Sequence, residues 1–223
     1  MKLNVKLVSY SKPTQEFEQE GLTDLQELIA FCAKVSNPAA QINTETSERL
    51  IRYLIKHQHW SPLEMVNAVL EIETTRDIAH QIVRHRSFAF QEFSQRYANP
   101  AEMGEQFVTR EARLQDPKNR QNSIGIDNES DLHYEWQMKQ QKVIDIAKET
   151  YDWAIKAGIA KEQARVVLPE GNTKTRLYMN GTLRSWVHYI ELRGANGTQK
   201  EHMDIAHACA KVISDIFPLM NDL

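Results

Sequence analysis

The sequence predicts an α+β fold, in which helices cover a mixed or antiparallel sheet within a single domain, residues 1–223. Residues 1–10 alternate apolar and polar side chains, which is typical of a half-buried strand, and residues 66–74 and 173–179 have strand patterns as well. Between these strands, apolar residues recur at helical spacing. Residues 99–131 form a polar stretch. Neither the chain before this stretch nor the chain after it contains both a sheet and its covering helices, so we expect a loop insertion there and not a domain boundary.

The helices are expected in a fixed order along the chain. The first of them places Leu25, Leu28, Ile29 and Cys32 on one face. The third directly follows the second strand, where Asp77 supplies an acidic cap. The full set comprises residues 23–35, 46–57 and 77–86, a long helix at 131–156 broken by Gly158, a short helix up to Pro169, and residues 182–192 and 200–217.

Composition narrows the class of protein. The chain carries 27 Lys and Arg against 30 Asp and Glu, a net charge of -3, which disfavours a dedicated nucleic-acid wrapper while leaving room for a local basic pocket. Two cysteines cannot build a disulfide framework, so a reducing cytoplasm is the expected compartment. No run approaches eighteen apolar residues, and we expect no membrane span.

Residues 81–97 concentrate cationic and aromatic side chains, with three arginines and one glutamate in an acidic chain. On a helical wheel Arg86 falls within the apolar face, so it either turns away at the helix end or pairs with an anion. A nucleotide would explain both features, because arginine binds phosphate in a bidentate manner and stacks on rings. The alternative is a helix end whose cations complement the macrodipole.

The order of residues in this segment is distinctive. Arg84-His85-Arg86 is followed after seven residues by Ser94-Gln95-Arg96-Tyr97. Together with further segments spread over residues 30–217, this set resembles the flavin-dependent thymidylate synthase family. The further matching segments, in the family's order, are Ala33-Lys34-Val35-Ser36, His59-Trp60-Ser61-Pro62-Leu63-Glu64, Ala164-Arg165-Val166-Val167-Leu168-Pro169, Leu183-Arg184-Ser185 and Glu191-Leu192-Arg193.

The resemblance implies a fold of that family's type and the reductive methylation of dUMP to dTMP. The carbon donor would be methylenetetrahydrofolate, the hydride carrier FAD and the reductant NADPH, without a cysteine nucleophile. The residues agree on the last point, because neither Cys32 nor Cys209 has a neighbouring base that would activate a thiolate, and both are expected in the core. The resemblance also implies a cytoplasmic homotetramer whose sites are assembled from several subunits.

By the same resemblance, a set of residues would contact FAD, whose pyrophosphate needs cationic or amide donors. No Gly-x-Gly-x-x-Gly follows a strand, so a Rossmann site is not expected. Members of the family often carry Asn where this chain has Thr182. The expected FAD contacts are Ser36, His59, Ser61, Glu64, Arg84, His85, Arg86, Glu92, Thr182, Leu183, Arg184 and His188.

The resemblance also assigns the dUMP site, with Ser94 and Arg96 directed to the phosphate. Arg193 would be the catalytic residue, a fixed cation that faces the pyrimidine carbonyl and stabilises the negative charge that develops as hydride arrives. The expected dUMP contacts are Gln81, Ile82, Val83, Arg84, Glu92, Phe93, Ser94, Gln95, Arg96, Arg165 and Arg193.

Some features stay outside this assignment. The histidines lack metal-ligand spacing, so no metal is expected, and His57, His80, His133, His202 and His207 are expected to be surface or packing residues. The stretch at 99–131 carries Arg110, Arg113, Lys118 and Arg120, and three interpretations stay open for it: a mobile lid, a contact on the FAD side, or a solvated charged loop. Two rival functions also stay open, a nucleotide-binding regulator that has lost catalysis and an RNA-binding segment at 84–96.

Overall fold

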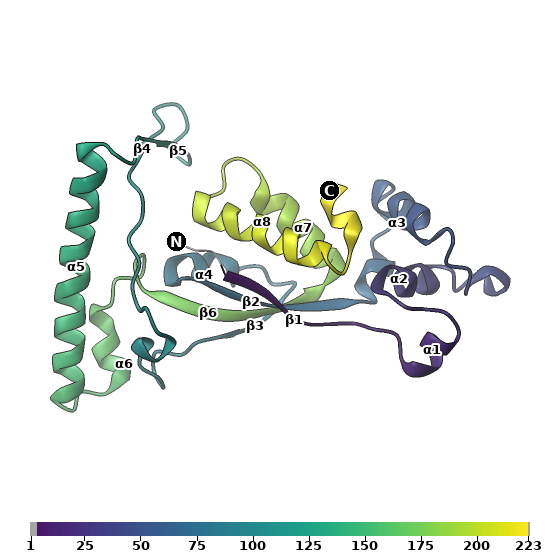
Figure 1. Cartoon of the computed structure of the whole chain (residues 1–223), viewed down its shortest axis with the longest axis horizontal. Coiled ribbons are helices and arrows are strands. Elements are labelled where there is room, and N and C mark those ends of the chain that lie inside the picture. Colours follow the sequence, from purple (N-terminus) through teal and green to yellow (C-terminus); the bar gives the residue numbers. More distant parts are fainter. Residues whose placement is uncertain (1–3, 223) are drawn as a thin grey trace.

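The structure is a computed structural model that describes residues 4–222, and its centre is a four-stranded sheet in the order β1-β2-β6-β3 (Figure 1). Every pair in this sheet is antiparallel, which decides between the mixed and antiparallel arrangements expected from the sequence. The first residues of the expected strand at 1–10 lie outside the described range. The strands are β1 Asn4–Tyr10, β2 Asn67–Thr75, β3 Ala89–Glu92 and β6 Lys174–Thr182.

Three helices lie on the same side of this sheet: α4 (Arg76–Ile82), α7 (Leu183–Gly194) and α8 (Lys200–Ser214) (Figure 1). The helices α2 (Leu25–Ala33) and α3 (Ser47–Lys56) pack on each other at one end of the molecule, and α5 (Asp131–Lys156) stands at the opposite end with α6 (Lys161–Ala164). The expected α+β class is therefore confirmed. The shorter elements are α1 Gln15–Gln19, β4 Arg113–Gln115, β5 Ser123–Gly125, and the 3-10 turns η1 Pro38–Ala40, η2 Ser61–Glu64, η3 Pro100–Met103, η4 Arg165–Val167 and η5 Pro218–Asp222.

The core forms where the apolar faces of β2 and β6 meet the three covering helices. Leu70 pairs with Met179 and Ile72 with Leu177, and all four side chains are fully buried. Burying a side chain of this size stabilises the fold by about 1.5–3 kcal/mol. This pairing fixes the register of the two strands, since a slip by one residue would turn these side chains to the other face.

The segment after α4 differs from the sequence-based expectation. A helix over 77–86 was expected, but α4 ends at Ile82, and the chain turns before entering β3, which pairs with β6. Pairing in the sheet overrides the helical periodicity of the following residues. Because Arg84, His85 and Arg86 lie beyond the helix, the question of a buried Arg86 is resolved: it is exposed.

Phe88 lies over the sheet at a position that depends on a glycine. A Cβ added at Gly181 of β6 would come within 2.4 Å of two atoms of the Phe88 ring. That ring packs edge-on against Trp186, at 4.8 Å between centroids, and lies 5.9 Å from Tyr189. The close approach therefore seats Phe88 against α7.

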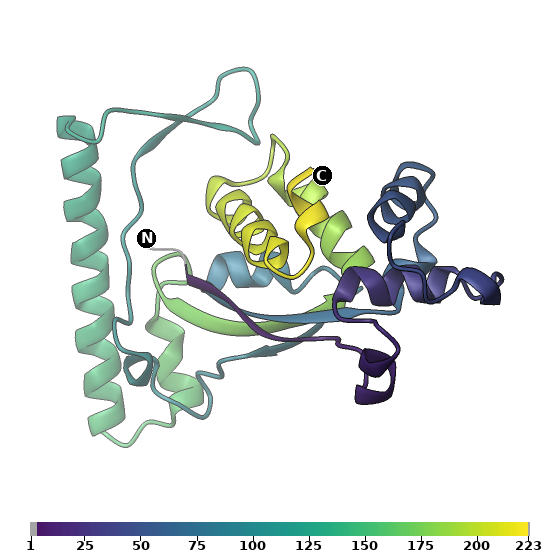
Figure 2. The same cartoon turned by 45° about the vertical axis from the view of Figure 1, so that its right-hand side comes forward.

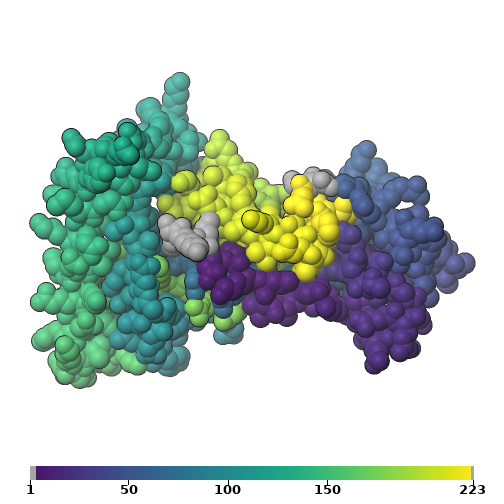
Figure 3. Space-filling view, in the orientation of Figure 1, coloured from purple at the N-terminus to yellow at the C-terminus, as the bar shows by residue number. Residues whose placement is uncertain are grey.

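Seen as a surface, the molecule has two wide ends joined by a narrower middle that contains α8 and β1 (Figure 3). The long helix α5 is reached by an extended connection and stands apart from the sheet (Figure 2). It carries an apolar stripe of five side chains, which lie within an arc of about 100° on a helical wheel. These side chains are 45–65% exposed: Leu132, Trp136, Val143, Ile146 and Trp153. Among the described residues, no helix combines the length and hydrophobicity needed to cross a membrane.

Candidate active site

A cluster of polar side chains lies where α4, α7 and α8 meet; we call it the Gln81–Arg193 cluster. Arg193 Nε donates to His85 Nε2 at 2.9 Å, and the His85 ring lies edge-on to Tyr189 at 4.9 Å. His202 Nε2 is 3.1 Å from the Tyr189 hydroxyl, and His202 Nδ1 is 3.3 Å from Gln81 Oε1. The structure thus brings together three residues expected from the sequence, Gln81, His85 and Arg193, with two that were not.

The cluster contains one positive charge among neutral groups. Burial, and then the charge of Arg193, lower the pKa of His85, and the same two causes with His85 itself lower the pKa of His202 to about 4. Burial raises the pKa of Tyr189. Both imidazoles are therefore neutral near pH 7, and the uncompensated guanidinium of Arg193 can stabilise an anion that forms beside it.

Arg84 and Arg86 lie just beyond the end of α4, next to this cluster in the sequence. Both side chains are exposed, and neither has an ion-pair or hydrogen-bond partner among the described residues. Their charges are therefore available to a ligand. Ile82 is fully buried in the core and Val83 caps α4, so Ile82 could contact a ligand only through its backbone.

The expected FAD contacts from distant parts of the chain meet where η2 touches the start of α7. Arg184 Nη1 donates to Glu64 Oε1 at 2.6 Å, and the His188 ring lies 4.4 Å from that of Trp60. Thr182 caps α7 by accepting from the Ser185 N–H, and the neighbouring Leu183 is buried. His59 lies instead beside Tyr53 and His57 at the end of α3, while Ser36 and Ser61 are exposed.

A second group of expected substrate residues surrounds α6; we call it the Ser94–Arg165 group. Arg96 Nη2 lies 3.4 Å from Glu162 Oε2, and Arg165 Nε donates to the Glu162 carbonyl at 3.4 Å. Ser94 Oγ accepts from the Arg96 N–H at 3.4 Å. Gln95 is buried, and its Nε2 has no partner. Phe93 is half-buried. Among the described residues, no hydrogen bond or ion pair joins this group to the Gln81–Arg193 cluster.

Glu92 does not face the arginines with which the sequence groups it. Its Oε1 accepts from Arg76 Nη1 and from the Thr175 hydroxyl, each at 2.9 Å. Glu92 is therefore held on the sheet by two partners within the chain. A carboxylate engaged in this way serves first to fix β3 against β6.

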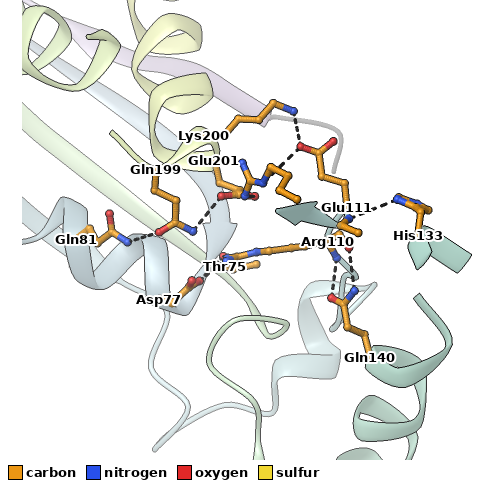
Figure 4. Close-up of polar contacts among 12 residues, drawn as sticks. Thr75, Asp77, Gln81, Arg110, Glu111, His133, Gln140, Gln199, Lys200 and Glu201 are labelled. Carbon is orange, nitrogen blue, oxygen red and sulfur yellow. Dashed lines mark hydrogen bonds and ion pairs between the residues drawn. The ribbon is translucent and has the colours of Figure 1, made fainter. Parts of the chain in front are cut away.

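The stretch at 99–131 is anchored to α4 and α8 through its arginines (Figure 4). Arg110 Nη2 donates to Thr75 Oγ1 at 2.6 Å and to Asp77 Oδ1 at 2.7 Å. The backbone of Arg110 exchanges two hydrogen bonds of 2.8 Å with the Gln140 amide. Arg113 binds Glu201, at the start of α8. The interpretation of this stretch as a solvated loop is therefore wrong for these two arginines.

A cavity of about 930 Å³ opens between the β4–β5 hairpin, the start of α5 and the α7–α8 turn. Its walls include Arg113, Arg120, Trp136, Gln199 and Lys200. Gln199 Oε1 accepts from Gln81 Nε2 at 2.8 Å, which links this wall to the cluster. The sequence does not reveal this link, because the two glutamines are 118 residues apart and Gln199 lies in no motif.

The two cysteines have no role in this arrangement. Cys209 is fully buried and Cys32 half-buried, and burial raises the pKa of both thiols. Neither is poised as a thiolate at neutral pH. The chemistry of the site must therefore come from its arginines, histidines and amides.

Comparison with known proteins identifies similar chains. Residues 20–219 match the family model described as thymidylate synthase complementing protein, Thy1. A probable flavin-dependent thymidylate synthase of Paramecium bursaria Chlorella virus 1 is 48% identical over 216 residues, covering 97% of this chain and 96% of the relative. A flavin-dependent thymidylate synthase of Synechocystis is 45% identical over the same share of both chains.

Among solved structures, the UMP/dUMP methylase PolB of Streptomyces cacaoi, bound with 5-Br dUMP, superposes with a TM-score of 0.81. The match covers 99% of this chain and 93% of PolB at 24% identity. At that identity the likeness establishes a shared fold.

Proposed function

The chain belongs to the flavin-dependent thymidylate synthase family, and from this premise we propose that it converts dUMP to dTMP by reductive methylation. In this proposal methylenetetrahydrofolate supplies the carbon, and NADPH reduces the FAD. The observation that carries the proposal is the Gln81–Arg193 cluster, in which Arg193 is held by the neutral His85, and His85 is flanked in the sequence by the unpaired Arg84 and Arg86.

The residues of the chain fit a bound flavin. Arg84 and Arg86 offer two unpaired guanidinium groups to a pyrophosphate, and the Glu64–Arg184 pair with His188 and its neighbouring ring forms a second polar wall. When bound, FAD supplies the hydride that reduces the transferred carbon unit. Of the remaining expected contacts, Ser36, His59 and Ser61 extend the proposed flavin surface towards α2 and α3.

Arg193 performs the electrostatic part of the reaction in this proposal. Its guanidinium is held through Nε by His85, which leaves its other N–H groups for the substrate. Since arginine only donates, His85 Nε2 must accept, and the proton of this neutral imidazole is on Nδ1. A cation fixed in this way stabilises negative charge on the pyrimidine carbonyl without reorganising during the reaction.

The complete dUMP site takes residues from more than one subunit of a homotetramer. Gln81, Arg84 and Arg193 would read the base, while Ser94, Arg96 and Arg165 of another subunit would hold the phosphate. Among the described residues of one chain, no hydrogen bond or ion pair joins these two sets, which supports this arrangement. So does the exposed apolar stripe on α5, because a surface of this kind is usually covered in an assembly.

Residues 1–223 act as one catalytic domain in this proposal, with 99–131 as an insertion anchored by Arg110 and Arg113. The compartment would be the cytoplasm. Size-exclusion chromatography with light scattering tests the assembly: a tetramer is expected, and a monomer that turns over would contradict the shared site.

The decisive experiment is spectroscopic and catalytic. The purified protein, loaded with FAD, should be yellow, lose its visible absorbance with NADPH in the absence of oxygen, and release tritium from dUMP labelled at the 5 position when methylenetetrahydrofolate is present. A protein that cannot be reconstituted with FAD would contradict the proposal. Binding of dUMP without turnover would favour the regulator, and a steep salt dependence with oligonucleotides would favour RNA binding.

A further inference from the structure

A directional chain of hydrogen bonds runs from the start of α8 into the Gln81–Arg193 cluster. Gln199 Nε2 donates to Glu201 Oε2 at 3.0 Å, and Gln199 Oε1 accepts from Gln81 Nε2 at 2.8 Å (Figure 4). The chain continues from Gln81 Oε1 to His202 at 3.3 Å and from His202 to the Tyr189 hydroxyl at 3.1 Å.

The Glu201 carboxylate at one end determines which atoms donate and which accept along this series of hydrogen bonds. An ionised carboxylate only accepts, so Gln199 must turn its NH₂ to Glu201 and its oxygen to Gln81. Gln81 must then turn its NH₂ to Gln199 and its oxygen to His202, whose Nδ1 carries the proton. Tyr189 donates to the remaining nitrogen of His202.

Glu201 is well placed to set this direction. Its carboxylate also accepts from Arg113, and its side chain is 19% exposed. Although burial opposes ionisation, hydrogen bonds from Arg113 and from Gln199 contribute to holding the pKa of Glu201 below its ordinary value. Glu201 is therefore ionised at neutral pH, and the acceptor at the end of the chain is permanent.

We propose that Glu201 is a positioning residue that acts through Gln199 to fix the orientation of the Gln81 amide. This inference rests on the proposed function, because it takes Gln81 as a dUMP contact. A fixed amide leaves one N–H donor and one oxygen lone pair of Gln81 for the substrate. These complement a ring carbonyl beside a ring N–H, as in uracil, and a reversed amide would present them in the wrong order.

The test compares dUMP binding to FAD-loaded variants by equilibrium dialysis. Glu201→Gln keeps the shape of the side chain but allows either end of its amide to face Gln199, and the dissociation constant for dUMP should rise about tenfold, near the lower end of the cost of one charged hydrogen bond. The turnover number at saturating dUMP should change less than twofold. Glu201→Asp keeps an acceptor and should restore most of the affinity.

A matched control and a second background separate positioning from general damage. Glu105→Gln makes the same chemical change in a surface ion pair with Lys174, and it should leave dUMP affinity unchanged. In the Gln81→Ala background, Glu201→Gln should raise the dissociation constant for dUMP by less than a further twofold, because the amide that Glu201 orients is gone. If Glu201→Gln fails to fold, Gln199→Met breaks the same chain and should raise the dissociation constant similarly.

Each result decides the inference. Unchanged affinity in Glu201→Gln, or an equal loss in the Gln81→Ala background, would overturn it and leave the proposed function intact. Tight dUMP binding by Gln81→Ala alone would overturn it as well, by removing Gln81 from the site. Failure of the proposed function is distinct, since the unaltered enzyme would then form no dTMP.

Discussion

The Gln81–Arg193 cluster and the Ser94–Arg165 group contain similar side chains, but they differ in burial and in how firmly hydrogen bonds hold them. In the cluster, His202 and Tyr189 are fully buried and each polar group is directed by a neighbour. In the Ser94–Arg165 group, the Arg96 and Glu162 side chains are 53% and 50% exposed and their single contact is 3.4 Å long. The first is organised within one chain, whereas the arginines of the second are held only by weak contacts of 3.4 Å.

This difference indicates which work each region can do. A charge fixed in a buried, neutral surrounding can stabilise a developing anion, because the arrangement is already in place when the reaction begins. Exposed arginines that close on the phosphate, which does not react, bind the substrate and the transition state equally, so they contribute affinity more than rate. Substitutions in the two regions test this division.

The largest effect is expected for Arg193→Ala. Losing a fixed cation at the pyrimidine carbonyl should reduce the turnover number by about 100- to 1000-fold, the cost of removing one preorganised donor. Tritium release from labelled dUMP measures it, and FAD should still bind. Arg49→Ala, an exposed arginine of α3, is the control. A loss below threefold would remove Arg193 from the chemistry.

Arg96→Ala should act on affinity. We expect the KM for dUMP to rise about 10- to 50-fold, as for the loss of a charged hydrogen bond to phosphate, with a smaller change in kcat. Unfolding midpoints should match those of the parent. If kcat fell as steeply as in Arg193→Ala, the proposed contrast between the two regions would be wrong.

The cluster should also make stability depend on pH. His202 has a pKa of about 4 in the folded protein against 6.5 ordinarily, so between these values the unfolded chain binds more protons and stability rises with pH. Above pH 6.5 this contribution is constant. Between pH 7 and pH 5 the parent should lose about 1–2 kcal/mol through this residue.

Urea unfolding at fixed protein concentration measures that loss, and His202→Asn should show a shallower dependence on pH. His85 titrates in the same direction, so a residual slope is expected. An identical slope in parent and variant would show that His202 does not titrate as an isolated buried group.

The smallest effect is expected for Glu162→Gln, which removes the surface partner of Arg96. An exposed ion pair contributes about 0–1 kcal/mol, so the free energy of unfolding should change by less than about 0.5 kcal/mol. Affinity for dUMP should stay the same or improve slightly, because Arg96 is released. A large loss of stability would mean that this group is as organised as the cluster.

The sequence predicts the fold where local periodicity and tertiary packing agree. The helices at 46–57 and 131–156 appear within a residue of their expected ends, because apolar spacing and capping residues act locally. The strand β3 was missed because it depends on pairing with β6, which lies far along the chain. The same pairing ends α4 early.

The candidate site follows the same division. The motif residues His85 and Arg193, which the resemblance assigns to different ligands, are hydrogen-bonded although 108 residues separate them. His202 was expected to be a surface or packing residue, and it is buried but hydrogen-bonded within the cluster. Glu92 was expected at a ligand, and the structure shows its carboxylate bound by Arg76 as well. These contacts join elements that are distant in the sequence, so local sequence patterns do not predict them.

The absence of a Cβ atom at Gly181 affects side chains outside β6. Any larger residue there would displace the Phe88 ring, which rests on Trp186 and close to Tyr189, the last donor in the chain that orients Gln81. If codon 181 were randomised and cells selected for growth without thymidine, we would expect glycine to be the dominant survivor.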